Sequence, residues 1–244
     1  MKLGESMASI VEIFPSIQGE GLSVGVSTLF IRFSGCNLNC SYCDTKYAKE
    51  EKEKFTVTKE DGTVLEFLNP VTPERLVEIL RENYDFTYFP QLALTGGEPL
   101  LHASFLKDFL AKLSYPGDVL LETNGTLPEK LREVISYIDI VSQDYKFKPF
   151  VTEEFKAVHR EFLRIAIYKK TYVKMVISPE VQDLPFNEAI DTIALVNSKI
   201  PLILQPVTPI TYSLDFLFQK QKKALEKLWE VRLIPQVHKL LQIK

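Results

Sequence analysis

The sequence lacks the features that would indicate a membrane, a nucleic acid or an export route. None of its apolar stretches approaches the roughly 18 to 20 uncharged residues that a bilayer-spanning helix needs. It has no dense run of Lys and Arg and a formal net charge of −3, so its electrostatics give no reason to expect a nucleic acid partner. Residues 1–6 are too polar to form the apolar core of a signal peptide. We therefore expect a cytoplasmic protein with no membrane and no nucleic acid partner.

Cysteine is also scarce, with three residues in the whole chain. An odd number excludes a complete disulfide framework, and reduced thiols agree with a cytoplasmic location. The three are Cys36, Cys40 and Cys43, at the spacing C-x-x-x-C-x-x-C. Three thiolates from one loop can bind a soft metal centre, but they leave a four-coordinate site or an iron-sulfur cubane one ligand short. The pattern therefore favours an iron-sulfur cluster with one iron open to a small molecule.

A structural zinc site is the alternative interpretation of these cysteines. Zinc would need a fourth ligand, and the histidines of the chain are His102, His159 and His238. None of them lies at the short spacing that zinc modules use. A non-enzymatic zinc-binding scaffold protein is thus the second hypothesis.

Short apolar runs alternate with segments of helical period along the chain. With 45% hydrophobic residues the chain can bury a full core, and one domain spanning 1–244 is expected. The expected strands are 28–33, 91–94, 119–122, 138–142, 172–177 and 202–205, and the expected helices are 73–83, 102–113, 128–137, 152–167, 186–197 and 214–229. This alternation predicts an α/β fold of parallel strands with right-handed crossovers, either a barrel or an open doubly wound sheet.

Polar or glycine-rich segments follow four of these strands at their carboxyl ends. They are the cysteine loop after Phe33, Thr-Gly-Gly-Glu-Pro at 95–99, Glu-Thr-Asn-Gly at 122–125 and Ser-Gln-Asp at 142–144. Each segment alone is ordinary turn chemistry. Ligands of parallel α/β folds bind at the carboxyl ends of the strands, so the recurrence predicts one shared active site.

The segment 49–70 interrupts this alternation. Two short β-type runs, 55–58 and 64–67, flank a glycine-containing turn, which predicts an inserted hairpin after the cysteine loop. We expect it to project beside that loop. A lid, a dimer contact and a structural excursion are all open as roles.

The cysteine spacing, with Tyr42 just before the third cysteine, and the Gly-Gly-Glu-Pro loop after the next strand resemble the radical S-adenosylmethionine superfamily. The resemblance implies a partial TIM-type barrel of about six parallel strands. It also implies a [4Fe-4S] cluster whose open iron binds S-adenosylmethionine, followed by hydrogen abstraction from the substrate by a deoxyadenosyl radical. A glycyl-radical-enzyme activating enzyme would share these features and is the alternative within this chemistry.

The residues ahead of the cysteine loop are more specific. Residues 16–21, Ser-Ile-Gln-Gly-Glu-Gly, and 30–36, Phe-Ile-Arg-Phe-Ser-Gly-Cys, resemble the 7-carboxy-7-deazaguanine synthases, and matching pieces at 43–45, 95–99, 122–125, 204–206 and 236–239 extend the likeness over nearly the whole chain. The resemblance implies a lyase that converts 6-carboxytetrahydropterin to 7-carboxy-7-deazaguanine and ammonia, in the biosynthesis of 7-deazapurines such as queuosine. It further implies a magnesium ion, an electron donor such as flavodoxin or ferredoxin, and a homodimer.

The same resemblance implies roles for individual residues. The cluster ligands are Cys36, Cys40 and Cys43, and Thr45 binds magnesium. The S-adenosylmethionine pocket comprises Tyr42, Cys43, Asp44, Gly97, Glu122, Ser142, Gln143, Asp144, Gln205, Pro206, Val207 and Thr208. Substrate contacts are Ile17, Gln18, Gly19, Arg32 and Thr95, and the candidate catalytic residues, which position the substrate, are Glu20, Arg32 and His238.

The residue types suit this substrate. Glu20 can accept hydrogen bonds from the donor edge of a pterin, and Arg32 can hold a carboxylate in a charge-assisted pair. His102 and His159 lie on expected helices and are expected to be structural or solvated.

The sequence departs from the family pattern in two places. Many members have Ser-Pro-Lys where this chain has Ser-Gln-Asp at 142–144, and Lys146 is a candidate to replace the missing lysine. The chain also continues past His238 to Lys244, so a substrate contact made by the chain terminus in other members need not occur here.

Overall fold

The computed structural model describes residues 6–151 and 154–243, and these residues form one ten-stranded sheet in the order β10-β9-β8-β7-β6-β5-β2-β1-β3-β4. Strands β2 and β5 to β10 run parallel to one another. The order begins at β10 and ends at β4, so the sheet is open. The fold is therefore α/β with a mostly parallel central sheet, as the sequence predicts at this level.

Each of the six expected strands is present. They are β2 (Ser27–Phe33), β5 (Gln91–Gly96), β6 (Asp118–Thr123), β7 (Ile140–Asp144), β8 (Lys170–Ile177) and β9 (Leu202–Pro206). Their bounds differ from the expected ones by one or two residues, mostly because the ladders extend into the polar ends of the runs.

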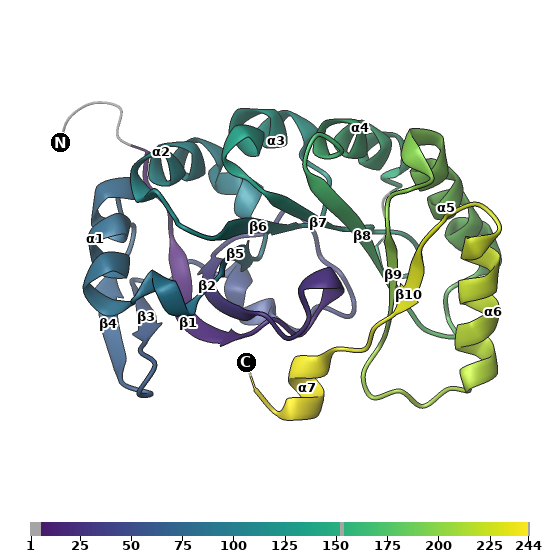
Figure 1. The fold of residues 1–244 in the computed structure, drawn as a ribbon, viewed down its shortest axis with the longest axis horizontal. Coiled ribbons are helices and arrows are strands. Elements are labelled where there is room, and N and C mark those ends of the chain that lie inside the picture. Colours follow the sequence, from purple (N-terminus) through teal and green to yellow (C-terminus); the bar gives the residue numbers. More distant parts are fainter. Residues whose placement is uncertain (1–5, 152–153, 244) are drawn as a thin grey trace.

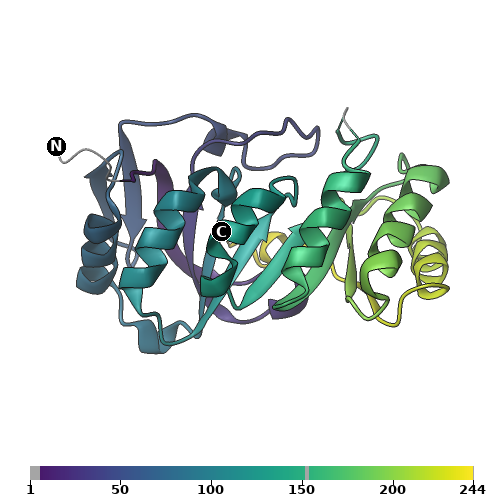
Figure 2. The same cartoon turned by 90° about the horizontal axis from the view of Figure 1, so that it is seen from above.

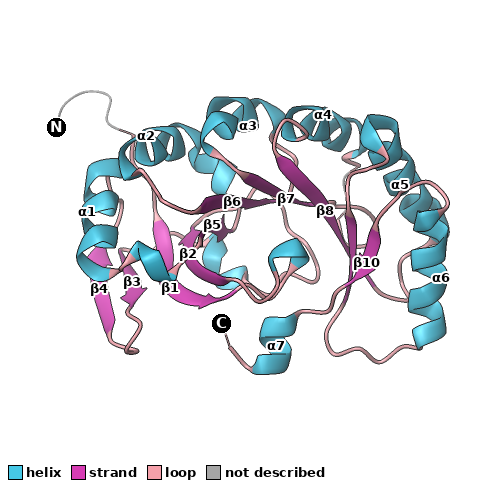
Figure 3. Cartoon of the chain, in the orientation of Figure 1, coloured by secondary structure: helices cyan, strands magenta, loops and turns pink. Residues whose placement is uncertain are grey.

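The expected helices are also present, as α1 (Pro73–Asn83), α2 (Ala103–Leu113), α3 (Pro128–Val134), α4 (Lys156–Ala166), α5 (Asp183–Asn197) and α6 (Leu214–Leu225). Thr72 caps α1 by accepting a hydrogen bond from the Arg75 backbone, and Pro73 occupies its first position. Residues 152–153, the expected start of α4, lie outside the described residues. Figures 1 to 3 show these six helices along one side of a strongly curved sheet.

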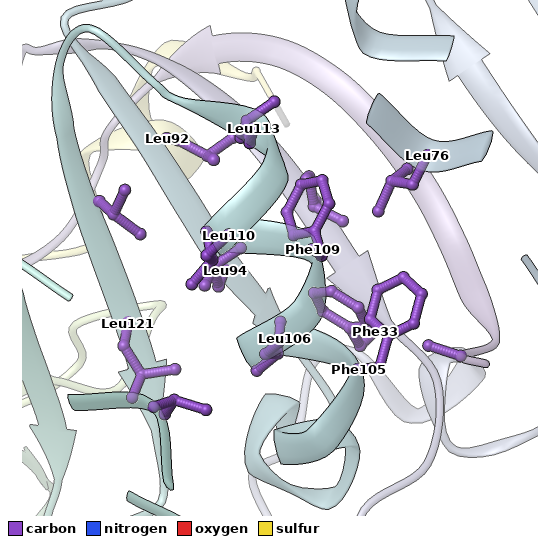
Figure 4. Packing of buried hydrophobic residues seen from close by; sticks show 14 of the residues in the cluster. Phe33, Leu76, Leu92, Leu94, Phe105, Leu106, Phe109, Leu110, Leu113 and Leu121 are labelled. Atoms are coloured by element: carbon purple, nitrogen blue, oxygen red, sulfur yellow. The ribbon is translucent and has the colours of Figure 1, made fainter. Parts of the chain in front are cut away.

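The main core lies between these helices and the sheet. Figure 4 shows α2 on β2, β5 and β6, with Phe105 and Phe109 directed at Phe33, Leu94 and their neighbours. The rings of Phe33 and Phe105 pack edge to face with centroids 6.2 Å apart. Apolar residues on one stripe of each helix thus bury the helix side of the sheet, and polar loops are left for the opposite side.

The sequence pattern did not predict strand β1 (Ile10–Ile17), which pairs antiparallel with β2 and parallel with β3. A proline such as Pro15 argues against a central strand, because it has no backbone N–H to donate to a neighbouring strand. The pairing with β3 involves Glu12 and Ile13 only, so Pro15 lies beyond it and needs no donor on that side.

The segment 49–70 contains the antiparallel pair β3 (Lys54–Thr58) and β4 (Val64–Leu68). The expectation that it projects beside the cysteine loop is wrong, because β3 pairs with β1 and extends the sheet at one edge (Figure 1). Phe55 and Val57 are buried in the main core, which explains why the hairpin joins the sheet.

The C-terminal elements β10 (Val231–Leu233) and α7 (Val237–Leu241) were not expected from the sequence either. Both are too short to give a periodic signal. Figure 1 shows α7 on the side of the sheet opposite the other helices. There the backbone N–H of Val237 donates to the carbonyl of Gly19 at 2.9 Å. In the described part of the chain, no helix combines the length and apolar character needed to cross a bilayer.

His159 of α4 connects the helix layer to the loops beyond the strand ends. Its ring is fully buried, with Nδ1 near Gln143 Nε2 (2.9 Å) and the Gly125 carbonyl (3.1 Å), and with Nε2 near the backbone N–H of Lys146 (3.1 Å). A neutral ring can donate from one nitrogen and accept at the other, so these partners satisfy it without a charge. Burial lowers the pKa of His159 from an ordinary 6.5 to about 4.

This depressed pKa predicts a specific acid sensitivity. Above pH 6.5 the ring is neutral in both states and the stabilisation is fully present; between pH 6.5 and 4 only the unfolded chain binds the proton. The free energy of unfolding should therefore fall by about 3 kcal/mol across that window through this group. Urea unfolding of the cluster-free protein from pH 4 to 7.5 measures it. His159→Gln should lose this component of the slope and His102→Gln should keep it; equal slopes in both variants would contradict the assignment.

Candidate functional site

An open cavity of about 570 Å³ lies at the carboxyl ends of the parallel strands. This size is typical of small-molecule sites. Every site residue named from the sequence lines it except Gln143; among the lining residues are Ile17, Gln18, Gly19, Glu20, Arg32, Cys36, Cys40, Tyr42, Cys43, Asp44, Thr45, Thr95, Gly97, Glu122, Ser142, Asp144, Gln205, Pro206, Val207, Thr208 and His238. The structure thus places the expected cofactor residues and the expected substrate residues around one space.

Gln143 is the correction. Side chains alternate across β7, so Ser142 and Asp144 face the cavity while Gln143 faces α4, where its Nε2 lies 2.9 Å from His159 Nδ1. The prediction that 142–144 all line the pocket therefore holds for the first and third residues only. The alternation of side chains along a strand would have been enough to predict that Gln143 points away from the pocket.

The cysteine loop and the Gly-Gly-Glu-Pro loop are held together by backbone contacts. The register of β2 on β5 places Phe33 opposite Gly96, and the N–H of Gly97 donates to the Phe33 carbonyl at 3.1 Å. A Cβ atom on Gly97 would lie 1.9 Å from the Gly35 carbonyl oxygen, so no side chain fits there. This glycine is required by close approach of two backbones.

Glu98, the next residue, is a fully buried carboxylate with several donors. Its Oε1 accepts from Thr123 Oγ1 at 2.8 Å and from the Leu100 backbone at 3.1 Å, and its Oε2 accepts from the Asn124 backbone at 2.8 Å. Burial raises the pKa of Glu98 to about 7, although these hydrogen bonds favour the charged form. The side chain joins the loop after β5 to the loop after β6 and does not line the cavity.

The three cysteines are free and lie around one end of the cavity. Cys40 is buried, Cys36 and Cys43 are partly buried, and all three pack with Leu38 and Val151. Burial raises the pKa of the Cys36 and Cys40 thiols. Within residues 6–151 and 154–243, no group of three His, Cys, Asp or Glu side chains converges on a single ion. Ligands of a cubane bind different irons and need no common point, whereas zinc ligands do.

A buried ammonium group lies beside the cysteines. Lys146 Nζ donates to Tyr42 Oη at 2.6 Å and to Asp144 Oδ2 at 2.8 Å, and it lies 4.7 Å from the centre of the Tyr42 ring. Although burial opposes the charge, Asp144, Tyr42 and Cys40 together raise the pKa of Lys146 well above its ordinary value. Lys146 therefore places a positive charge in the cavity wall beside Tyr42 and Asp144.

The Gln-Gly-Glu motif lines another part of the same cavity. Gln18 Nε2 donates to Glu122 Oε1 at 3.0 Å, which connects this motif to the carboxyl end of β6. Glu20 Oε1 accepts from Gln205 Nε2 at 3.1 Å and from Gln236 Nε2 at 2.9 Å, and its Oε2 pairs with Lys174 Nζ. Although burial alone would raise it, the pKa of Glu20 is lowered to about 2, chiefly by the charge of Lys174.

The C-terminal residues 236–239 contribute Gln236, His238 and Lys239 to the cavity wall. Gln236 Nε2 also approaches Asp44 Oδ2 at 3.3 Å, and Lys239 Nζ lies 3.2 Å from the same carboxylate. A Cβ atom on Gly19 would lie 2.4 Å from His238 Nδ1, so the glycine permits the histidine to approach. Glu20 and Asp44 are in this way connected through one glutamine.

Arg32 also lines the cavity. Its Nε donates to Glu12 Oε1 at 2.9 Å, and Tyr47 Oη donates to the same oxygen at 3.0 Å. The guanidinium carbon lies 5.6 Å from the Phe14 ring centre. The side chain is 14% exposed, so the ion pair is a mostly buried one at the cavity edge rather than a surface salt bridge.

Three polar atoms among the described residues of the cavity wall have no hydrogen-bond partner. They are Ser142 Oγ, Asp144 Oδ1 and Gln205 Oε1, and the last two are buried acceptors. A buried acceptor without a donor costs about 1 to 3 kcal/mol, so such atoms point to a ligand that donates to them.

The sequence reasoning missed Lys174, which lies in the middle of β8 and lines the cavity. The signal was available, because a lysine inside an otherwise buried apolar strand is rare unless it is paired. Gln236 was noted only as part of a matching motif, and its contacts with Glu20 and Asp44 depend on the tertiary fold.

Comparison with known proteins agrees with this geometry. Residues 30–145 match the family model of the radical SAM superfamily. The chain is 37% identical to a 7-carboxy-7-deazaguanine synthase of Geobacter sulfurreducens over 96% of this chain and 97% of that protein. It is 33% identical to one of Archaeoglobus fulgidus over 97% and 99% of the two chains.

A crystal structure of QueE from Escherichia coli is similar in fold, with a TM-score of 0.64 and 21% identity over 96% of both chains. Identity above 30% over the full length of several relatives settles the family. The chain belongs to the 7-carboxy-7-deazaguanine synthase family of the radical SAM superfamily.

Proposed function

We propose that this protein converts 6-carboxytetrahydropterin to 7-carboxy-7-deazaguanine and ammonia. The observation that carries the proposal is that the three-cysteine loop and the Gln-Gly-Glu motif line the same cavity, with Gln236 bonded to both Glu20 and Asp44. Membership of the family argues against the glycyl-radical activating enzyme and the zinc scaffold.

The residues present fit a [4Fe-4S] cluster. Three free thiols surround one end of the cavity without converging on one point, and Gly97 allows the loop after β5 to contact the cysteine loop directly. Cys36, Cys40 and Cys43 would hold the cluster. The buried ammonium group of Lys146, which donates to Tyr42 Oη, would lie beside the cluster.

The residues also fit S-adenosylmethionine. The unpaired acceptors Asp144 Oδ1 and Gln205 Oε1 match the amino and hydroxyl donors of this molecule. The bound cluster and cofactor would supply the electron and the radical that starts the reaction. The protein's own task is to orient the substrate, to exclude water and to hold the charges around the cavity.

The substrate end requires acceptors for a pterin edge and a cation for a carboxylate. Glu20 and the backbone of Ile17 to Gly19 would accept from the donor edge, and Arg32 would bind the carboxylate. Thr95 and His238 would contact the substrate from the two sides of the cavity. Thr45 would contribute one ligand to a magnesium ion, since magnesium keeps most of its ligands from water or substrate.

Several wider features belong to the same proposal. We regard residues 1–244 as one radical S-adenosylmethionine domain in which the curved open sheet is an incomplete TIM-type barrel, with 49–70 as an inserted hairpin. The reductant would be a flavodoxin or ferredoxin, and the protein would act as a homodimer. Free thiols must stay reduced to hold a cluster, which favours the cytoplasm.

The cluster assignment predicts the outcome of replacing one cysteine. Anaerobically reconstituted wild-type protein should be brown, with about four irons per chain. Cys40→Ala should lose most of this iron and all turnover, while Ser41→Ala, at the exposed neighbouring position, should keep both. Iron analysis and visible absorption measure loading, and mass spectrometry measures 7-carboxy-7-deazaguanine. A colourless wild-type protein, or a loaded one that consumes no pterin, would refute the proposed function.

The carboxylate-binding role predicts the effect of Arg32→Lys. Lysine keeps the charge that pairs with Glu12 but loses the guanidinium fork, so a charge-assisted bond worth about 1.5 to 3 kcal/mol is weakened. We expect KM for the pterin to rise about 10- to 100-fold, with iron content unchanged. Arg75→Lys, at an exposed position of α1, is the control and should leave KM unchanged. An unaltered KM in Arg32→Lys would remove Arg32 from the substrate site.

A further inference from the structure

Lys174 is a buried cation beside Glu20, and the cluster, cofactor and substrate contacts of the proposed function do not include it. Its side chain is 8% exposed and its Nζ pairs with Glu20 Oε2. The strand register places it opposite Asp144 on β7 and Ile203 on β9. Glu20 comes from a loop more than 150 positions earlier in the chain, so this pair connects two distant parts of the fold.

A buried lysine is costly to keep. Removing an ammonium group from water costs several kcal/mol, and an ion pair offsets this only with good geometry and further hydrogen bonds. Here the extra bonds are present, because two amides, Gln205 Nε2 and Gln236 Nε2, donate to the other oxygen of Glu20. All the protein donors around Glu20 favour one state of it, the ionised carboxylate.

The charged groups around the pair come from every neighbouring element. Glu20 faces Lys174 from β8 and His238 from α7, and Lys174 also faces Glu122 of β6 and Asp144 of β7. Of these groups, Lys174 is the one that forms a salt bridge with Glu20. Without it, burial would favour a protonated Glu20, which would present a donor where the substrate also presents donors.

We propose that Lys174 is a positioning residue that fixes Glu20 as an ionised acceptor and so selects substrates whose heterocyclic edge carries adjacent N–H donors. The inference rests on the proposed function and adds to it the origin of the site's selectivity. Lys174 acts through Glu20 and makes no contact with the reacting atoms. The Lys174–Glu20 pair would not increase the affinity for a ligand that lacks these N–H donors.

The test compares two ligands on the cluster-loaded enzyme with S-adenosylmethionine. The dissociation constants of 6-carboxytetrahydropterin and of its 2-desamino analogue are measured anaerobically by calorimetry from pH 5.5 to 8. The proteins are the wild type, Lys174→Met, Lys174→Arg and Lys170→Met. Lys170 lies on the same strand with a 75% exposed side chain, so it controls for loss of a lysine from β8.

The wild type and Lys170→Met should prefer the pterin over the analogue by about tenfold or more, with little dependence on pH. Lys174→Met should lose this preference, and its affinity for the pterin should fall further as the pH decreases, because Glu20 then gains a proton within the range. Lys174→Arg should restore both. A Lys174→Met protein that keeps the preference and the flat pH profile, or that loses affinity for both ligands equally, would overturn the proposal.

Lys174→Gln is the second variant, because it can still donate to Glu20 and leaves no apolar group beside the carboxylate. It should retain its cluster and show the same pH dependence as Lys174→Met; a flat profile would overturn the proposal even if Lys174→Met fails to fold. Wild-type protein that neither binds nor converts the pterin would remove the proposed function as well. Wild-type turnover with unchanged selectivity in the variants would remove this inference alone.

Discussion

The parallel pairing of β2 with β5 is the constraint on which the site depends. It sets Arg32 opposite Thr95 and Phe33 opposite Gly96, so the two loops that leave these strands start side by side. Their backbones then bond directly, from Gly97 N–H to the Phe33 carbonyl and from Glu98 N–H to the Gly35 carbonyl. A shift of one residue would turn these side chains to the opposite face and separate the loops. The position of the cysteines is thus decided by a hydrogen-bonded register that involves no cofactor contact.

Most of the parallel sheet and its helices could be predicted from the sequence, because each run is long enough to show its period and α1 carries clear start signals in Thr72 and Pro73. β1, β10 and α7 could not. A proline inside β1, Pro15, argues against a strand in the sequence pattern. The segments of β10 and α7 are held by backbone hydrogen bonds to Leu204 and Gly19, and their own sequences show no periodic pattern. The hairpin at 54–68 was foreseen, but its place in the sheet depends on the burial of Phe55 and Val57, which no local signal reveals.

The candidate site was largely accessible from motifs, and its electrostatics were not. Gly97 and the cysteines occur at recognisable spacing, and their place at strand ends follows from the fold class. The ion pairs of Lys146 with Asp144 and of Lys174 with Glu20 join residues that are distant in sequence or absent from the motifs. Both lysines are nearly buried, so the cavity wall holds fixed charges that are largely shielded from solvent. Charges in such surroundings act more strongly than they would on the surface.

The docking of residues 236–239 on Gly19 and Asp44 has a consequence for the order in which the site is assembled. Gln236 follows Asp44 by 192 positions, so it is made well after the cysteine loop and the Gln-Gly-Glu motif. A chain still being synthesised can form the β2–β5 pair long before Gln236 exists. This part of the cavity wall is therefore completed only after residues 236–239 have been made, so a chain that had acquired a cluster before then would still lack it.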